Sequence, residues 1–323
     1  MMRFLLPTLI VVLGQDVTPE KVFKGHQGDV YDLAFSPRGS LFATASFDRT
    51  VKIWSLETGK EVATLRGHMG KVFSVAFNAD GSQLLSAGDD KTLKLWNVQS
   101  PSEPERTFTG HHGWVHAAVL SPDGKTAASA GGDKTLRLWN LQRDKPFRTV
   151  EAHGASVYSL AYSPDGKVLA SGGYDTMIKL WNGRTGQESR KLAGHGEVVT
   201  DLEFSKDGKS LFSCSFDMTI RKWSVEKGRE VAVFKGSSFK GHSERVMGLS
   251  LSPSGKEMVS FDLAGHLLTW DLDTGKVIDR RTISQAISPA SAVYDIALSP
   301  DGKWLLVAAG SGGVLLFRYE QGR

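Results

Sequence analysis

Cysteine, charge imbalance and catalytic motifs are all scarce in this sequence. Its 323 residues include one cysteine, Cys214, which excludes an intramolecular disulfide and a zinc site built from several cysteine thiolates. The 39 lysines and arginines nearly balance 35 aspartates and glutamates, and a net charge of +4 disfavours a dedicated nucleic-acid-binding protein. The sequence has no phosphate-binding loop, dinucleotide-binding fingerprint or HExxH zinc motif.

Long apolar runs are also missing outside the N-terminus, where residues 4–13 are predominantly apolar. This run follows a positive charge at Arg3 and ends at Gly14, and it is too short to span a ~30 Å bilayer as a helix. The arrangement predicts a short signal for secretion or transport to the periplasm, and an ordinary apolar start of a cytoplasmic protein is the alternative. We expect residues 1–15 to be a signal peptide or an unstructured start and residues 16–323 to form a single domain.

The sequence does contain an internal repeat. Seven units begin near residues 25, 67, 110, 152, 194, 241 and 288, with a Gly-His or Ala-His pair at the start of the first six. Each unit contains short apolar runs separated by turns rich in Pro, Gly and Asp, which predicts strands joined by hairpin turns. No segment shows the apolar spacing of a helix over helical length.

Units of this length, with Gly-His near the start and Trp-Ser, Trp-Asn or Trp-Asp near the end, resemble WD40 repeats. The resemblance covers residues 20–323. It implies an all-β fold, namely a seven-bladed β-propeller of four-stranded antiparallel blades around a central channel. The last unit supplies only three strands, so the resemblance implies that residues 20–24 pair into the last blade and close the ring.

The resemblance also implies a role for the repeated histidines. In WD40 repeats the His bonds a Ser or Thr of the second strand, which contacts the Trp of the third strand, and a turn Asp holds the His from its other side. Five units contain the full set: His26, Thr44, Asp48 and Trp54; His68, Ser86, Asp90 and Trp96; His111, Ser129, Asp133 and Trp139; His153, Ser171, Asp175 and Trp181; and His195, Ser213, Asp217 and Trp223. Five regular copies favour a structural bond over Ser-His-Asp hydrolase chemistry, which needs one site.

The last two units depart from this pattern. The sixth keeps His242, Ser260 and Trp270 but has Ala264 in the Asp position. The seventh has none of the set and carries Pro289, Val307, Ser311 and Phe317 instead. We expect these two blades to be looser or to be held by apolar packing.

The family pattern further implies a partner-binding surface on the top face, where three positions in each blade point outward. They lie three and five residues after the His and one residue before the turn Asp. The residues predicted to contact a partner are Tyr31, Phe47, Lys71, Phe73, Asp89, Trp114, His116, Tyr158, Tyr174, Phe216, Arg245, Met247 and Tyr294. Aromatic side chains, Arg and Met are enriched at protein interfaces. The alternative is that some rings lean sideways and pack between neighbouring blades.

A further column, six residues after the His, contains Asp32, Asp201 and Asp295. These carboxylates could converge on the channel and hold waters or a hard cation, but we favour the simpler interpretation that they cap the starts of strands. The sequence as a whole predicts a non-catalytic, monomeric scaffold that binds a protein or peptide on its top face, without a cofactor, nucleic acid or transmembrane segment. The alternative is a secreted propeller enzyme, or a binder of a small ligand or cation, that uses the channel.

Overall fold

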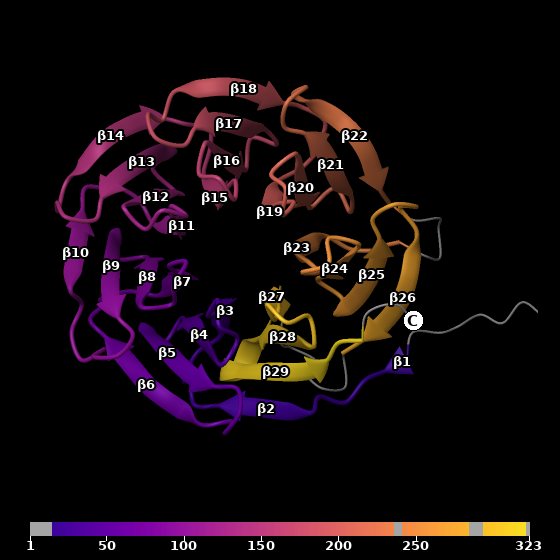
Figure 1. Ribbon diagram of the computed structural model, residues 1–323, viewed down its shortest axis with the longest axis horizontal. Coiled ribbons are helices and arrows are strands. Elements are labelled where there is room, and N and C mark those ends of the chain that lie inside the picture. Colours follow the sequence, from indigo (N-terminus) through magenta and orange to yellow (C-terminus); the bar gives the residue numbers. More distant parts are fainter. Residues whose placement is uncertain (1–14, 236–240, 284–292, 321–323) are drawn as a thin grey trace, which may run out of the picture.

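Seven antiparallel sheets stand like blades around a central channel in the computed structural model, which describes residues 15–235, 241–283 and 293–320 (Figure 1). The apolar run at residues 4–13 lies outside the described residues. Each blade begins with a strand beside the channel and places its later strands progressively outward. The predicted seven-bladed all-β propeller is therefore confirmed.

The strands follow the repeat in order, four to a blade, with β2 completing the last blade and β1 added to the sixth. They are β1 (Gln15–Asp16), β2 (Lys21–Lys24), β3 (Val30–Phe35), β4 (Leu41–Ser46), β5 (Thr50–Ser55), β6 (Glu61–Arg66), β7 (Val72–Phe77), β8 (Gln83–Gly88), β9 (Thr92–Asn97), β10 (Arg106–Thr109), β11 (Val115–Leu120), β12 (Thr126–Gly131), β13 (Thr135–Asn140), β14 (Pro146–Glu151), β15 (Val157–Tyr162), β16 (Val168–Gly173), β17 (Ile178–Asn182), β18 (Glu188–Leu192), β19 (Val199–Phe204), β20 (Ser210–Ser215), β21 (Ile220–Ser224), β22 (Arg229–Phe234), β23 (Val246–Leu251), β24 (Glu257–Asp262), β25 (His266–Asp271), β26 (Val277–Thr282), β27 (Val293–Leu298), β28 (Trp304–Ala309) and β29 (Gly313–Arg318). A 3-10 turn, η1 (Gly310–Gly312), connects β28 to β29.

Two strands near the N-terminus pair with strands of the last two blades. Strand β2 pairs antiparallel with β29, with Lys21 opposite Leu316, so the predicted closure of the last blade is confirmed. Strand β1 pairs in parallel with β26 of the sixth blade, with Gln15 opposite Arg281. This second pairing was not predicted, and it covers the outer edge of β26 over two residues.

The hydrophobic core is divided among the interfaces between neighbouring blades. Between the first two blades, for example, Val51 and Ile53 of β5 pack with Val75 of β7 and Trp96 of β9. Each blade is covered on both faces by its neighbours, which explains why the strands are apolar on both sides. Each interface stabilises the fold mainly through the apolar area that it removes from water.

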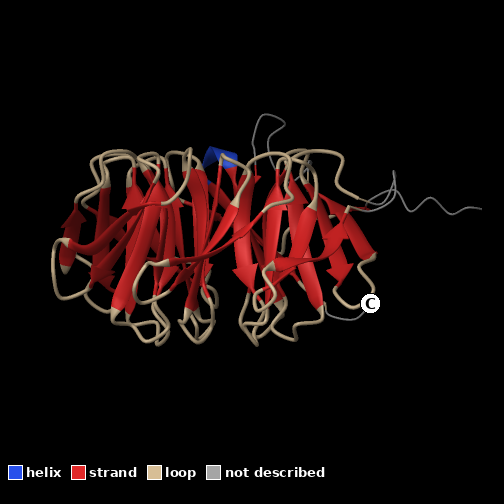
Figure 2. Cartoon of the chain, turned by 90° about the horizontal axis from the view of Figure 1, so that it is seen from above, coloured by secondary structure: helices blue, strands red, loops and turns tan. Residues whose placement is uncertain are grey.

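The loops between strands gather on two opposite faces of the ring (Figure 2). One of these faces carries η1 together with the remaining turns that join second to third strands. The same face carries the loops that contain the repeated histidines, because these loops hydrogen bond to the turns in six blades. We call this the top face.

Candidate docking site at the channel mouth

The five complete sets of His, Ser or Thr, Asp and Trp form the same network inside their blades. In the third blade, the Trp139 indole N–H donates to Ser129 Oγ over 2.8 Å, and Ser129 Oγ lies 2.6 Å from His111 Nε2. His111 Nδ1 lies 2.8 Å from Asp133 Oδ2. Because the hydroxyl oxygen accepts from the indole, its proton is available for Nε2, and the neutral imidazole donates from Nδ1 to the carboxylate.

Burial and hydrogen bonding set the charge of these groups. Burial alone would raise the pKa of Asp90, but hydrogen bonds from His68 and from the Met69 amide lower it to about 2. Burial lowers the pKa of His111 and of His153 below the ordinary value, against the opposing effect of their Asp partners. Each Ser or Thr hydroxyl is fully buried and bonded on both sides. The network therefore satisfies buried polar groups and presents no attacking oxygen to a substrate.

The sixth blade completes the same network with a residue that the sequence interpretation missed. Asp262, which ends β24, accepts from His242 Nδ1 over 2.9 Å and from His266 Nδ1 over 3.1 Å. The expectation that Ala264 leaves this blade without its Asp was wrong. The carboxylate comes from two residues earlier, and Gly265 takes the left-handed conformation (φ 79°) that non-glycine residues adopt in the first five blades.

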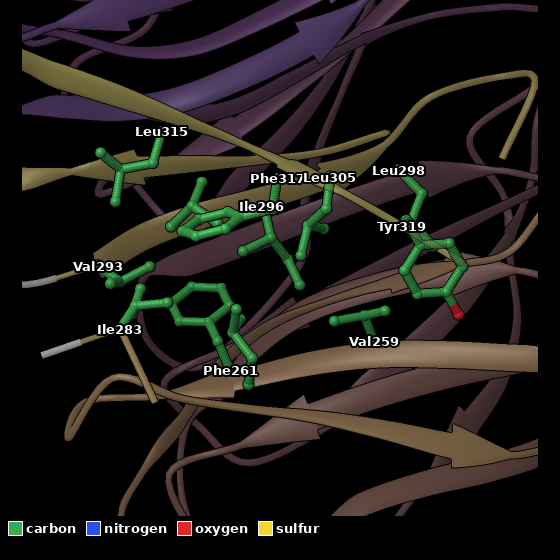
Figure 3. Packing of buried hydrophobic residues seen from close by; sticks show 12 residues of the cluster. Val259, Phe261, Ile283, Val293, Ile296, Leu298, Leu305, Leu315, Phe317 and Tyr319 are labelled. Atoms are coloured by element: carbon green, nitrogen blue, oxygen red, sulfur yellow. The ribbon is translucent and has the colours of Figure 1, made fainter. Parts of the chain in front are cut away.

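The seventh blade replaces the network with apolar packing, as expected. Phe317 is 3% exposed in the position of the repeated Trp and belongs to a cluster that β24 and β25 share with β27, β28 and β29. Figure 3 shows these side chains interleaving between the two blades. The Tyr319 hydroxyl donates to Glu257 Oε2 of the sixth blade over 2.6 Å, which adds one buried polar link. Pro289 lies outside the described residues.

A β-bulge in every innermost strand shapes the mouth of the channel. In β3 the register shifts between Val30 and Asp32, so Tyr31 is the extra residue. The same shift occurs in the other six inner strands, at Phe73, His116, Tyr158, Thr200, Met247 and Tyr294. In a regular strand the side chains of neighbouring residues point to opposite faces, but a bulge changes the direction of one of them. Residues five and six after the His therefore both line the channel.

The seven bulged residues, which we call the channel rim, surround one cavity of about 260 Å³ at the mouth of the channel. Five neighbouring members form a continuous series of ring contacts that we call the aromatic arc. The ring centroids of the arc are 5.5 Å apart for Tyr294–Tyr31, 5.3 Å for Tyr31–Phe73, 5.2 Å for Phe73–His116 and 4.7 Å for His116–Tyr158. The arc crosses the seventh blade and the first four blades.

Three further aromatic side chains extend the arc away from the channel. Phe47 stacks on Tyr31 with centroids 5.5 Å apart, and Trp114 packs edge-on against His116 at 6.0 Å. Trp114 and Tyr174 are 54% and 58% exposed, although both are large apolar side chains. Contiguous exposed apolar surface of this kind marks interaction sites.

The other predicted contact residues differ in how much surface they offer. Lys71 and Arg245 are exposed, and each places its cation over a neighbouring ring, Phe47 at 4.3 Å and Phe216 at 4.9 Å. Phe73 is only 9% exposed, so it offers little surface of its own and mainly supports the arc. The remaining predicted residues are half-buried: Tyr31, Phe47, Asp89, His116, Tyr158, Phe216, Met247 and Tyr294. Some of the predicted contact residues therefore pack sideways against neighbouring blades, and others are exposed to solvent.

The channel carboxylates lie in the same cavity and bond to the next blade along the ring. Asp32 Oδ2 accepts from the Val75 amide over 2.7 Å, and Asp295 Oδ2 accepts from the Leu33 amide over 3.0 Å. Asp201 Oδ2 likewise accepts from the Leu249 amide of the sixth blade over 3.1 Å. Asp201 Oδ1 also accepts from the Leu202 amide of its own strand over 2.7 Å. The expectation that these residues simply cap the starts of their strands was therefore incomplete, because each of them also bonds to a neighbouring blade.

Asp32 and Asp295 also hydrogen bond to each other, since the seventh and first blades are neighbours in the ring. Burial raises the pKa of both carboxyls, and the repulsion between them raises that of Asp295 further. Two carboxyls can bond in this way only when one holds a proton.

Within the described residues, no group of three or more His, Cys, Asp or Glu side chains is arranged to hold a metal ion. No helix in the described part of the chain is long and apolar enough to cross a membrane.

This architecture defines a repeat propeller whose loops surround a channel, and comparison with known sequences gives its family. The family described as "WD domain, G-beta repeat" matches residues 17–55, 59–97, 102–140, 144–182, 186–224 and 282–318. The chain belongs to the WD40 family. The sixth blade, where Asp262 replaces the turn Asp, lies between the last two matched segments.

Individual relatives are similar over segments of about the length of one repeat. A 40-residue segment, 12% of this chain and 5% of the relative, is 55% identical to U3 small nucleolar RNA-associated protein 13 of Saccharomyces cerevisiae. A 45-residue segment, 14% of this chain and 6% of the relative, is 51% identical to the probable E3 ubiquitin ligase complex SCF subunit sconB of Talaromyces marneffei. A 51-residue segment is 43% identical to the WD40 repeat-containing protein HOS15 of Arabidopsis thaliana, covering 16% and 8% of the two chains. The chain thus spans less than a tenth of the length of these relatives.

Proposed function

We propose that this protein is a non-catalytic scaffold that binds a peptide or protein segment across the aromatic arc and the exposed rings beside it. The carrying observation is that Trp114, beside His116, and Tyr174, beside Tyr158, remain more than half exposed next to a continuous series of ring contacts. Rigid aromatic side chains bury much area at low entropic cost, which makes them frequent anchors of binding.

The similar relatives support the same kind of role. One is named as a probable subunit of an E3 ubiquitin ligase complex. The bonded His, Ser or Thr, Asp and Trp sets of this chain recur from blade to blade. Because these sets are buried and bonded on every side, they supply rigidity rather than chemistry. Specificity then falls to the loops and the channel rim, where the residues differ from blade to blade.

A random heptapeptide library displayed on phage tests this proposal. We expect wild-type protein to enrich peptides that lose at least about tenfold in affinity for the Trp114→Ala and Tyr174→Ala variants. Phe147→Ala is the matched control, because Phe147 is a 49% exposed ring on the outer strand β14, away from the channel. Peptides that bind all three variants equally, or no enrichment at all, would overturn the proposal.

The apolar run at residues 4–13 supports a second proposal, that the protein is exported and loses its first residues near Gly14. The run is preceded by a positive charge and is too short for a membrane span. N-terminal sequencing of the natural protein tests this. A mature terminus close to Gln15 is expected, and an intact Met1 would contradict it.

A further inference from the structure

The cavity at the channel mouth combines aromatic walls with acidic side chains. Its described lining includes the aromatic arc together with Asp32, Asp201 and Asp295, and it includes no lysine or arginine. The aspartates follow the rim residues by one position on their strands, so they lie one residue farther from the loops of the top face. A group entering from the top face passes the rings before it reaches the carboxyls.

Charge and ring chemistry in this cavity favour a cation. The faces of Tyr31 and Tyr158 are electron-rich and attract positive groups within about 6 Å of the ring centre. The Asp32 and Asp295 carboxyls are held side by side away from bulk water, and a positive group beside them would relieve their mutual repulsion. Because the cavity wall supplies no basic side chain, the ligand has to bring the charge.

His116 adds an independent sign that the cavity takes a ligand. Its Nδ1 atom is buried and has no hydrogen-bond partner among the described residues. Burial lowers the pKa of His116 to about 4, so the ring is neutral at pH 7 and does not repel a cation. An unpaired buried nitrogen is costly, and an amide of a bound peptide could pair with it.

Two exposed cations near the channel rim already lie over aromatic rings. Lys71 lies over Phe47 and Arg245 lies over Phe216. Neither lines the cavity, so its acidic interior is not neutralised from within the described chain. The occupant with matching chemistry is a single basic side chain carried by a peptide.

We propose that the channel mouth receives one basic side chain, lysine or arginine, from a peptide bound across the aromatic arc. This inference rests on the proposed peptide-binding function and identifies the chemistry of its ligand. The aromatic arc encloses the aliphatic stem of the basic residue, and the aspartates of the first, fifth and seventh blades receive its charged end.

The peptides enriched from the heptapeptide library test the inference. We expect lysine or arginine to recur at one position, and its replacement by norleucine or citrulline to weaken binding by roughly tenfold or more. Asp32→Asn and Asp295→Asn should weaken the basic peptide by a similar factor and leave the norleucine or citrulline peptide unchanged. Both variants keep a side-chain oxygen for the inter-blade amide bonds, so folding is preserved, and the melting temperature verifies this.

The outcomes separate the two proposals. Enriched peptides that depend on Trp114 but carry no recurring basic residue, or that ignore both Asp→Asn variants, overturn the basic side chain and leave peptide binding intact. Failure to enrich peptides that depend on Trp114 overturns both. Comparison of lysine with arginine peptides then shows which cation the cavity prefers.

Discussion

The blade interiors and the channel rim differ in how they use the repeat. Inside the first six blades, the same His, Ser or Thr, Asp and Trp contacts recur, with nearly equal distances from the His to the hydroxyl. At the rim, one equivalent position holds five residue types across the seven blades: Tyr, Phe, His, Thr and Met. Positions that repeat hold the fold, and positions that vary within a fixed backbone geometry are free to recognise a partner.

Removing one repeated indole should have the largest effect on stability. Trp139 is fully buried and donates to Ser129, so Trp139→Ala leaves a cavity and an unpaired hydroxyl. We expect the free energy of unfolding to fall by about 3–5 kcal/mol. Urea unfolding of the variant beside wild type measures this, and a loss below about 1 kcal/mol would show that the blade interiors do not hold the fold as described.

Removing the substitute carboxylate of the sixth blade should have the next largest effect on stability. Asp262→Ala removes the acceptor of both His242 and His266, and we expect a loss of about 2–3 kcal/mol. Leu263→Ala, at the neighbouring exposed position, is the control and should change stability by less than about 0.5 kcal/mol. If the two variants unfold at the same urea concentration, Asp262 does not stand in for the missing turn Asp.

Replacing one carboxyl of the channel pair should change stability by a smaller amount and should raise it rather than lower it. The folded-state pKa of the pair is raised, so its contribution to stability is greatest at low pH and is lost as pH rises through the folded pKa. Asn does not titrate and keeps an acceptor for the Leu33 amide. Asp295→Asn should therefore be more stable than wild type by about 1 kcal/mol at pH 8, with the gain vanishing near pH 4.

The matched control for this pH dependence is Asp165→Asn, because Asp165 lies in an exposed turn and its pKa is lowered to about 2 by hydrogen bonds from Lys167 and Ser163. This control should show no gain at pH 8. Urea unfolding at pH 4, 6 and 8 measures both variants. A constant difference between Asp295→Asn and wild type across this range would show that the pair does not hold a proton in the folded state.

The sequence predicts the parts of the structure that repeat. Regular spacing revealed the seven units, and the resemblance to WD40 repeats then implied the blades, the closing strand β2 and the bonded sets such as His26 with Thr44. The bulges were not predictable, because they depend on how β3 and its counterparts pair with their neighbours and not on residue type. They explain why Tyr31 and Asp32, adjacent in the chain, line the same cavity.

Departures from the repeat were the hardest features to predict. Asp262 was missed because a search at the usual spacing finds Ala264, whereas the fold lets a carboxylate reach His242 from two residues earlier. The inter-blade bonds of Asp32 and Asp295 were missed because their partners are backbone amides, which no residue pattern reveals. The pairing of β1 with β26 of the sixth blade was missed for the same reason, because it depends on backbone hydrogen bonds and not on a residue pattern.

The most direct test compares peptide affinity with stability in Trp114→Ala. Trp114 is 54% exposed, so we expect a free energy of unfolding within about 0.5 kcal/mol of wild type and at least a tenfold loss of affinity for the library-selected peptides. Unchanged affinity, or a loss of stability approaching that of Trp139→Ala, would contradict the assignment of binding to the channel mouth.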